Sequence, residues 1–368
     1  MIYLAFHNLW QQKFRLALSI TGVALALMLI MVLNGFLAGV FTQVTAYLDN
    51  TPADLIVAQD GVTNLLSATS LLPAGAEDQA RGVPGIAQVT PIISQFTIFD
   101  IHEEKVVAYM VGYEPEKGGG PWRLKDGRPP DGDDEVVLDW VMAQNHGFEL
   151  GDTVEILDEE FIIAGLSDGT NSWMASFFFV EKRAAERLLS APGANGFLLL
   201  TLEPGTDPTA VEARLRRRLR NVEILPAATM RQNDLDLLVR VFAAPLRLMV
   251  AIAFAVGTAI LGMVIYTATV ERTREYGVLK AVGARNHHLY RLVTQQGVVT
   301  AVLGAILGIG LARLAALGIM DSSPKFLIVL EPKAVLVTSL SGLLMGILAA
   351  LLPAWHIARL DPAQVFRK

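Results

Sequence analysis

A cluster of charged residues lies between two strongly apolar segments of the sequence. Residues 271–288 read ERTREYGVLKAVGARNHH and combine acidic, basic and histidine side chains. Most of the stretch favours helix, and Gly283 is a natural residue to end one. Carboxylates and cations at this density can form ion pairs with a partner. We therefore interpret the stretch as a short helix that another protein can hold. The alternative is a solvated helix next to the membrane.

A second group of residues could bind an anion. Arg247 follows Pro245, Arg240 lies seven residues earlier on the same face of an expected helix, and Tyr47 lies at a matching depth in the membrane. One interpretation is that the arginines reach the lipid head groups and that Tyr47 anchors at the interface. The other is that they bind the carboxylate or phosphate of an amphiphile. Asn34, a polar residue within an apolar run, either bonds a neighbouring helix or lines a substrate path.

No arrangement of residues indicates catalysis. A hydrolase within the membrane needs Ser with Lys or His, or paired Asp, inside its spans, and no apolar run has such a set. The sequence also lacks the GxxxxGK[ST] pattern that cradles nucleotide phosphates. Without cysteine there is no thiolate metal site. We expect a protein that binds no metal or cofactor directly and does not itself hydrolyse ATP.

The elements that position these residues are membrane-spanning helices. Hydrophobic residues make up 52% of the chain, and apolar runs exceed the about 20 residues that cross a bilayer. Three of these runs carry small residues four apart, which lets helices pack closely: Gly35/Gly39, Gly304/Gly308 and Gly342/Gly346. We predict spans at 16–41, 241–270, 292–313 and 334–355.

The charges predict how these spans are oriented. Residues 42–240 hold 31 acidic and 16 basic side chains, a net charge of −15, whereas the connector 271–291 is rich in Arg and Lys. Basic residues in short connectors stay in the cytoplasm. The N-terminus (1–15), the connector and the tail (356–368) are then cytoplasmic, with 42–240 and the loop 314–333 outside. No basic face of domain size is available for nucleic acid.

The segment 42–240 has the pattern of a mixed α/β domain. Short runs rich in β-branched and aromatic residues alternate with turn clusters such as EKGGGP. Helices are expected at 181–189 and 207–220, the second with Pro208 at its start. Strands are expected at 53–58, 95–101, 105–112, 134–138, 153–157, 161–166, 177–180 and 197–202.

Three stretches resemble one family. ERTREYGVLKAVGA resembles the connector after the second span in permease subunits of the macrolide-exporter, lipoprotein-releasing and FtsX superfamily of ABC transporters. PAWHIARLDPAQVFRK is similar to the C-terminal end of that family, and EVVLDWVMAQNHGFELGDTVEIL to part of its extracytoplasmic domain. The resemblance covers the whole length. It implies an integral membrane protein with four transmembrane helices and a large extracytoplasmic α/β domain between helices 1 and 2.

The resemblance also implies partners. In this family the connector docks in a groove of a separate ATPase subunit, which binds the ATP and Mg²⁺. The residues that would form the coupling surface are Glu271, Arg272, Glu275, Tyr276, Gly277, Lys280, Ala281 and Gly283. A second permease, either another copy or a relative, would complete a complex of two permeases and two ATPases in the bacterial inner membrane. Whether a periplasmic adaptor joins is left open.

The implied function is outward export or extraction of a hydrophobic or amphipathic compound from the membrane. The stretch VGTAILGMVIYTATVERTREYGVLKAVGA looks closest to the branch of haem exporters and glycolipid-exporting permeases. Two alternatives are an FtsX-like mechanotransmitter, which activates an extracytoplasmic enzyme, and a lipoprotein-releasing subunit.

Overall fold

The protein is described here by a computed structural model that covers residues 13–66, 68–172, 174–271, 273–282 and 284–358. These residues form two compact units. The α/β unit comprises residues 39–241 and 324–327, and the membrane unit comprises the other described residues.

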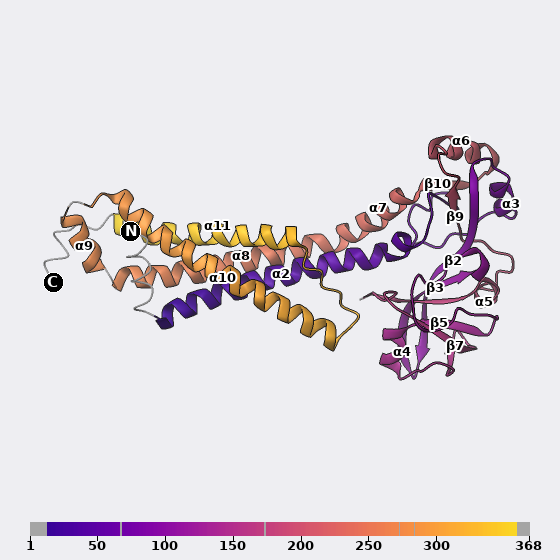
Figure 1. Cartoon of the computed structure of the whole chain (residues 1–368), viewed down its shortest axis with the longest axis horizontal. Helices are drawn as coiled ribbons and strands as arrows, with labels where there is room; N and C mark the ends of the chain where they lie inside the picture. The colour runs from indigo at the N-terminus through magenta and orange to yellow at the C-terminus, as the bar shows by residue number, and fades with distance from the viewer. Residues whose placement is uncertain (1–12, 67, 173, 272, 283, 359–368) are drawn as a thin grey trace. The chain divides into compact units, whose positions relative to one another are not determined.

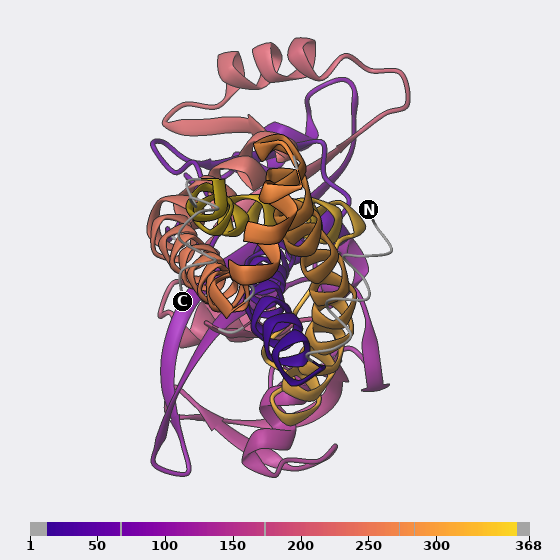
Figure 2. The same cartoon turned by 90° about the vertical axis from the view of Figure 1, so that its left-hand side faces the viewer.

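Four long apolar helices build the membrane unit, and each is long enough to cross a bilayer. They lie side by side in Figure 1 and gather into one bundle when viewed along their length in Figure 2. The first, α2, continues from this unit into the α/β unit and so extends past the predicted end of its span at residue 41. Their bounds are α2 (Lys13–Asn50), α8 (Ala244–Glu271), α10 (Asn286–Ser322) and α11 (Pro332–Ala358).

Glycine makes the close packing of this bundle possible. A Cβ placed on Gly304 would lie 2.6 Å from Val23, and one on Gly342 would lie 2.7 Å from Leu27. A Cβ on Gly346 would lie 2.7 Å from the carbonyl oxygen of Gly297. The predicted close approach of helices at these glycines is confirmed, because no larger residue fits there without movement.

The pair Gly35/Gly39 behaves differently. These glycines face the segment before α11 rather than another helix, and the carbonyl of Gly35 accepts a hydrogen bond of 2.9 Å from the N–H of Val329. A Cβ on Gly39 would overlap the carbonyl of Leu327. Here the two glycines let the backbone of the segment before α11 pack directly against α2.

The described part of the α/β unit builds a ten-stranded sheet in the order β10-β1-β9-β2-β3-β8-β5-β7-β4, with β6 paired to β7. Most pairs are antiparallel, but β3–β8 and β5–β7 are parallel. The strands are β1 (Leu55–Gln59), β2 (Ile86–Ile101), β3 (Glu104–Tyr113), β4 (Leu124–Gly127), β5 (Glu135–Asp139), β6 (Thr153–Ile156), β7 (Glu159–Ser167), β8 (Ser176–Glu181), β9 (Phe197–Leu202) and β10 (Val222–Pro226).

Short helices connect these strands. In α6 the side chain of Asp207 caps the N-terminus by accepting from the N–H of Thr209, and Pro208 occupies the first turn, as predicted. The helices are α3 (Ala76–Arg81), α4 (Trp140–His146), α5 (Lys182–Leu188), α6 (Pro208–Arg218) and α7 (Ala227–Leu238), with a 3-10 turn at Pro115–Lys117.

The middle of the sheet is buried on both faces. Along β8, Phe178 and Val180 enter one apolar cluster, whereas Phe177 and Phe179 enter another. Alternating side chains leave a strand on opposite faces, so a strand covered on both sides reads as a continuous apolar run. The run FFFV is such a strand.

Side-chain contacts fasten α7 to the rest of its unit. The carboxylate of Asp234 accepts from the N–H of Leu65 at 3.1 Å, and the amide of Asn233 donates to the carbonyl of Thr63 at 2.8 Å. Arg231 forms an ion pair of 2.7 Å with Asp49 near the end of α2. A π-helix, Val239–Ala243, follows α7 and leads into α8.

Candidate functional sites

The charged connector forms a helix of its own. Helix α9 (Thr273–Ala281) follows the end of α8 at Glu271 and precedes α10. Figure 1 shows it at one end of the four-helix bundle. Arg272 and Gly283, two residues of the predicted coupling surface, lie outside the described residues.

One face of α9 is fixed against the bundle. Tyr276 is only 3% exposed and belongs to the same apolar cluster as Leu289, Val293 and Ile357. Gly277 is also buried. The ammonium group of Lys280 donates to the carbonyl of Ala358 at 2.7 Å and so ties α9 to the end of α11. These three predicted residues hold the connector in place rather than face outward.

The other face of α9 is exposed and mixes charge with apolar side chains. Glu271, Glu275 and Ala281 are exposed, as a contact surface requires. Beside them Val278, Leu279 and Val282 are 42%, 46% and 84% exposed. We call the following exposed residues the α9 surface: Glu275, Val278 and Leu279 of α9, with Glu271 at the end of α8 and Val282 just after α9. Exposed apolar side chains grouped with charged ones are typical of protein interfaces.

Sequence reasoning missed the three apolar members of this surface. It selected residues by charge and by family resemblance. The signal was available in the spacing, because residues 278 and 282 are one helical turn apart and 275 and 279 are another such pair. Only the burial of Tyr276 shows which face they occupy.

Tyr47 is part of the core of the α/β unit. Its side chain is 1% exposed, its hydroxyl donates to the carbonyl of Gly119 at 2.7 Å, and its ring stacks on Phe177. The predicted interface anchor or substrate contact would need an exposed ring. In this structure the ring is enclosed because α2 continues past the predicted span and becomes part of the folded unit.

The two arginines are exposed, and they lie in different elements. Arg240 lies in the π-helix, and Arg247 lies in α8. Asn34 is half-buried in α2. The structure does not show these residues gathered at one site.

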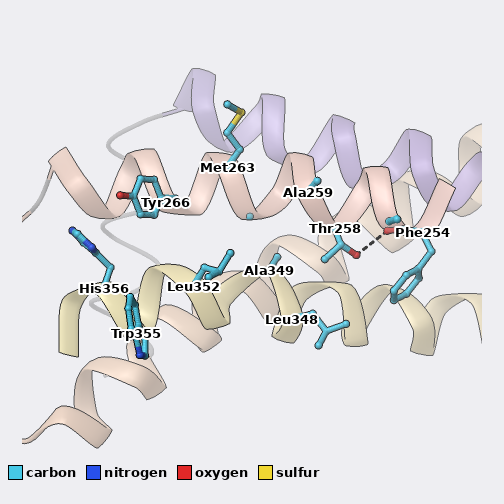
Figure 3. Close-up of a pocket in the computed structure, with 12 residues that line it drawn as sticks. Phe254, Thr258, Ala259, Met263, Tyr266, Leu348, Ala349, Leu352, Trp355 and His356 are labelled. Carbon is cyan, nitrogen blue, oxygen red and sulfur yellow. Dashed lines mark hydrogen bonds between the residues drawn. The ribbon is translucent and has the colours of Figure 1, made fainter. Parts of the chain in front are cut away.

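The structure reveals a further site that the sequence did not indicate. A groove of about 750 Å³ runs between α8 and α11 in the membrane unit. Its long side chains include Phe254, Met263, Leu352 and Trp355, and its small ones include Ala259 and Ala349. Figure 3 shows Tyr266 and His356 together at one end and Phe254 at the other.

The two units together define a class of protein, namely a multi-pass membrane protein with a large α/β domain inserted after its first long helix. Residues 16–218, more than half of the chain, match the MacB-like periplasmic core domain, and residues 247–362 match the FtsX-like permease C-terminal region. The chain therefore belongs to the MacB/FtsX-type permeases of ABC transporters.

Two relatives in sequence agree with this assignment, and one solved structure shows a weak likeness. An uncharacterized ABC transporter permease of Mycobacterium tuberculosis is 24% identical over 100% of this chain and 99% of its own. The macrolide export ATP-binding/permease protein MacB of Shewanella oneidensis is 23% identical over 81% of this chain and 49% of its own. The solved periplasmic region of MacB from Actinobacillus actinomycetemcomitans has a TM-score of 0.39 at 16% identity, covering 50% of this chain and 94% of its own.

Proposed function

We propose that this permease couples ATP hydrolysis by a separate ATPase subunit to the outward export or extraction of an amphipathic compound from the membrane. Its place in the family means that it works with an ATPase. The observation that supports the coupling is the α9 surface, in which exposed apolar and acidic side chains lie on a helix fixed to the bundle by Tyr276 and Lys280. A force applied to this face reaches α8 and α11 directly.

The proposed assembly contains two ATPase subunits and two permeases in the bacterial inner membrane, with the α9 surface in the cytoplasm. ATP and Mg²⁺ bind to the ATPase. Closure of the ATPase pair moves the two connectors, and the helices follow as rigid bodies between two arrangements. An anionic amphiphile, with haem or a glycolipid as examples, is the proposed substrate class. Exposed Arg240 and Arg247 are its proposed cationic contacts.

The coupling is tested with Leu279→Asp. This residue is 46% exposed, so the substitution leaves the bundle intact but places a buried charge in the interface. We expect association with the purified ATPase subunit to weaken by about 2 kcal/mol, roughly thirtyfold, as for an interface hot spot. Co-elution in lipid nanodiscs and the ATPase rate are the measurements.

A matched control uses the same substitution elsewhere. Leu71, in the α/β unit, is 56% exposed, and Leu71→Asp should leave ATPase association unchanged. Equal association for both variants and the parent would remove the α9 surface from the proposal.

A mechanotransmitter is a second candidate, supported by one surface of the α/β unit. On β2, Phe96 and Ile98 are 42% and 52% exposed and pair with Tyr109 and Val107 of β3. This apolar hairpin face suits a protein partner. Transport requires a small amphiphile to stimulate the ATPase rate of the reconstituted complex, whereas mechanical transmission requires a protein bound to the α/β unit.

A further inference from the structure

The groove between α8 and α11 has the length of one membrane leaflet. It extends along α8 from Phe254 to Tyr266. At 1.5 Å per residue this stretch is about 18 Å long. Half of the hydrocarbon core of a bilayer is roughly 15 Å thick. The groove therefore spans the depth that one acyl chain occupies.

Its lining gives the groove the form of a slot. Gly262 and Ala349 meet at the floor, where a Cβ on Gly262 would lie 3.5 Å from the carbonyl oxygen of Ala349. On the two helices Met263 is 72% exposed and Leu352 is 74% exposed, and both line the groove. The small residues at the floor and the long flexible side chains at the sides leave a narrow apolar space. This space suits a single acyl chain.

The two ends of the slot differ in chemistry. At one end Tyr266 and His356 have their ring centroids 5.5 Å apart, edge to face, and Trp355, which precedes His356 in the sequence, also lines the groove. The hydroxyl and imidazole N–H groups are hydrogen-bond donors. Tyr and Trp are enriched at the level of lipid head groups. No carboxylate is among the described lining residues, so this end suits an acceptor-rich group.

We propose that this groove is a phospholipid-binding site. One acyl chain lies along α8 and α11, with its end toward Phe254, and the phosphate lies at Tyr266 and His356. This site goes beyond the proposed function. Arg240 and Arg247 precede or begin α8, whereas the phosphate end of the groove lies on its last turns, which lead into α9. A phospholipid bound here separates α8 from α11 close to the point where Lys280 of α9 binds the end of α11.

The first test uses a substitution that fills the slot. Gly262→Leu places a side chain in it, and the ordinary contact distances at Gly262 allow the helix to accept a Cβ. The matched control is Gly310→Leu on α10, because nothing lies within 4 Å of a Cβ there. Native mass spectrometry of the full-length permease, released from phosphatidylglycerol nanodiscs, counts bound phospholipid. We expect Gly262→Leu to lose one phospholipid per chain and Gly310→Leu to keep it.

A second variant tests the phosphate end. His356→Ala should lose phosphatidylglycerol while keeping diacylglycerol, which has the same chains but no phosphate. Equal phospholipid retention by Gly262→Leu and Gly310→Leu, with both proteins monodisperse, would overturn the proposal. So would disulfide-linked dimers of Leu352→Cys in the otherwise cysteine-free chain, because a second copy would then cover the slot. Neither result depends on the ATPase, so the proposed function is judged separately.

Discussion

At the scale of single residues, Asp139 is a buried acid whose side chain has several hydrogen-bond partners. It is fully buried, and its carboxylate caps α4 by accepting from the N–H groups of Val141 and Met142. A chain of contacts continues from it through Thr170 (2.7 Å) and Ser167 (2.6 Å) to the carbonyl of Leu138 (3.2 Å). The hydroxyl of Thr170 donates to the carboxylate of Asp139. Burial raises the pKa of Asp139 to about 6.

This pKa has a consequence for stability. The folded-state pKa lies above the ordinary value of 3.8, so the native protein holds the proton more tightly than the unfolded chain. The contribution of Asp139 is therefore greatest below about pH 4, falls as the pH rises to about 6, and is constant above it. Two pKa units correspond to about 3 kcal/mol.

We predict that Asp139→Asn removes this dependence, because the amide does not titrate in this pH range and its oxygen can still cap α4. The free energy of unfolding of the variant, relative to the parent, should rise by about 3 kcal/mol between pH 4 and pH 7. Denaturant titrations of the detergent-purified chain, followed by tryptophan fluorescence, measure it. Asp126→Asn is the exposed control and should follow the parent. A variant that tracks the parent at all pH values contradicts the prediction.

At the scale of elements, the contact of α10 with α11 depends on glycine. A methyl group on Gly297 would overlap the carbonyl oxygen of Gly346, whereas one on Gly310 of the same helix would point into open space. We predict that Gly297→Ala destabilises the bundle by about 1–3 kcal/mol. Gly310→Ala should be neutral or slightly stabilising, because alanine favours helix. The melting temperature in one detergent compares the pair, and equal melting would show that the helices move apart at no cost.

At the scale of the whole molecule, the prediction concerns which side of the membrane each unit faces. The absence of cysteine provides a clean background for single-cysteine labelling. Val282 on the α9 surface is 84% exposed, and the side chain of Lys105 at the start of β3 is 73% exposed. We expect a membrane-impermeant maleimide to label Lys105→Cys in intact spheroplasts and Val282→Cys only after lysis. Labelling of both cysteine variants from the same side of the membrane would contradict the proposed coupling.

Much of the fold was predictable because local patterns carry it. The four long helices follow from apolar runs, and β8 and β9 follow from short apolar segments. Several elements were missed, namely the strands β4 and β10, the first half of β2, and the helices α3 and α7. β10 is a five-residue mixed strand that is recognisable only by its pairing with β1, and the first half of β2 contains a proline. The order of strands in the sheet could not be predicted from the sequence either, because β1 pairs with β9, which lies far from it in the chain.

The sequence by itself determined the membrane class, the family and the position of the connector, because hydropathy, charge and a contiguous motif are local properties. Tertiary structure decided which side chains are exposed and which of them lie together. It enclosed Tyr47, turned Tyr276 inward and Val282 outward, and brought Tyr266 of α8 beside His356 of α11. Exposure depends on what packs against a residue. Those neighbours are distant in the chain, so no local pattern reports them.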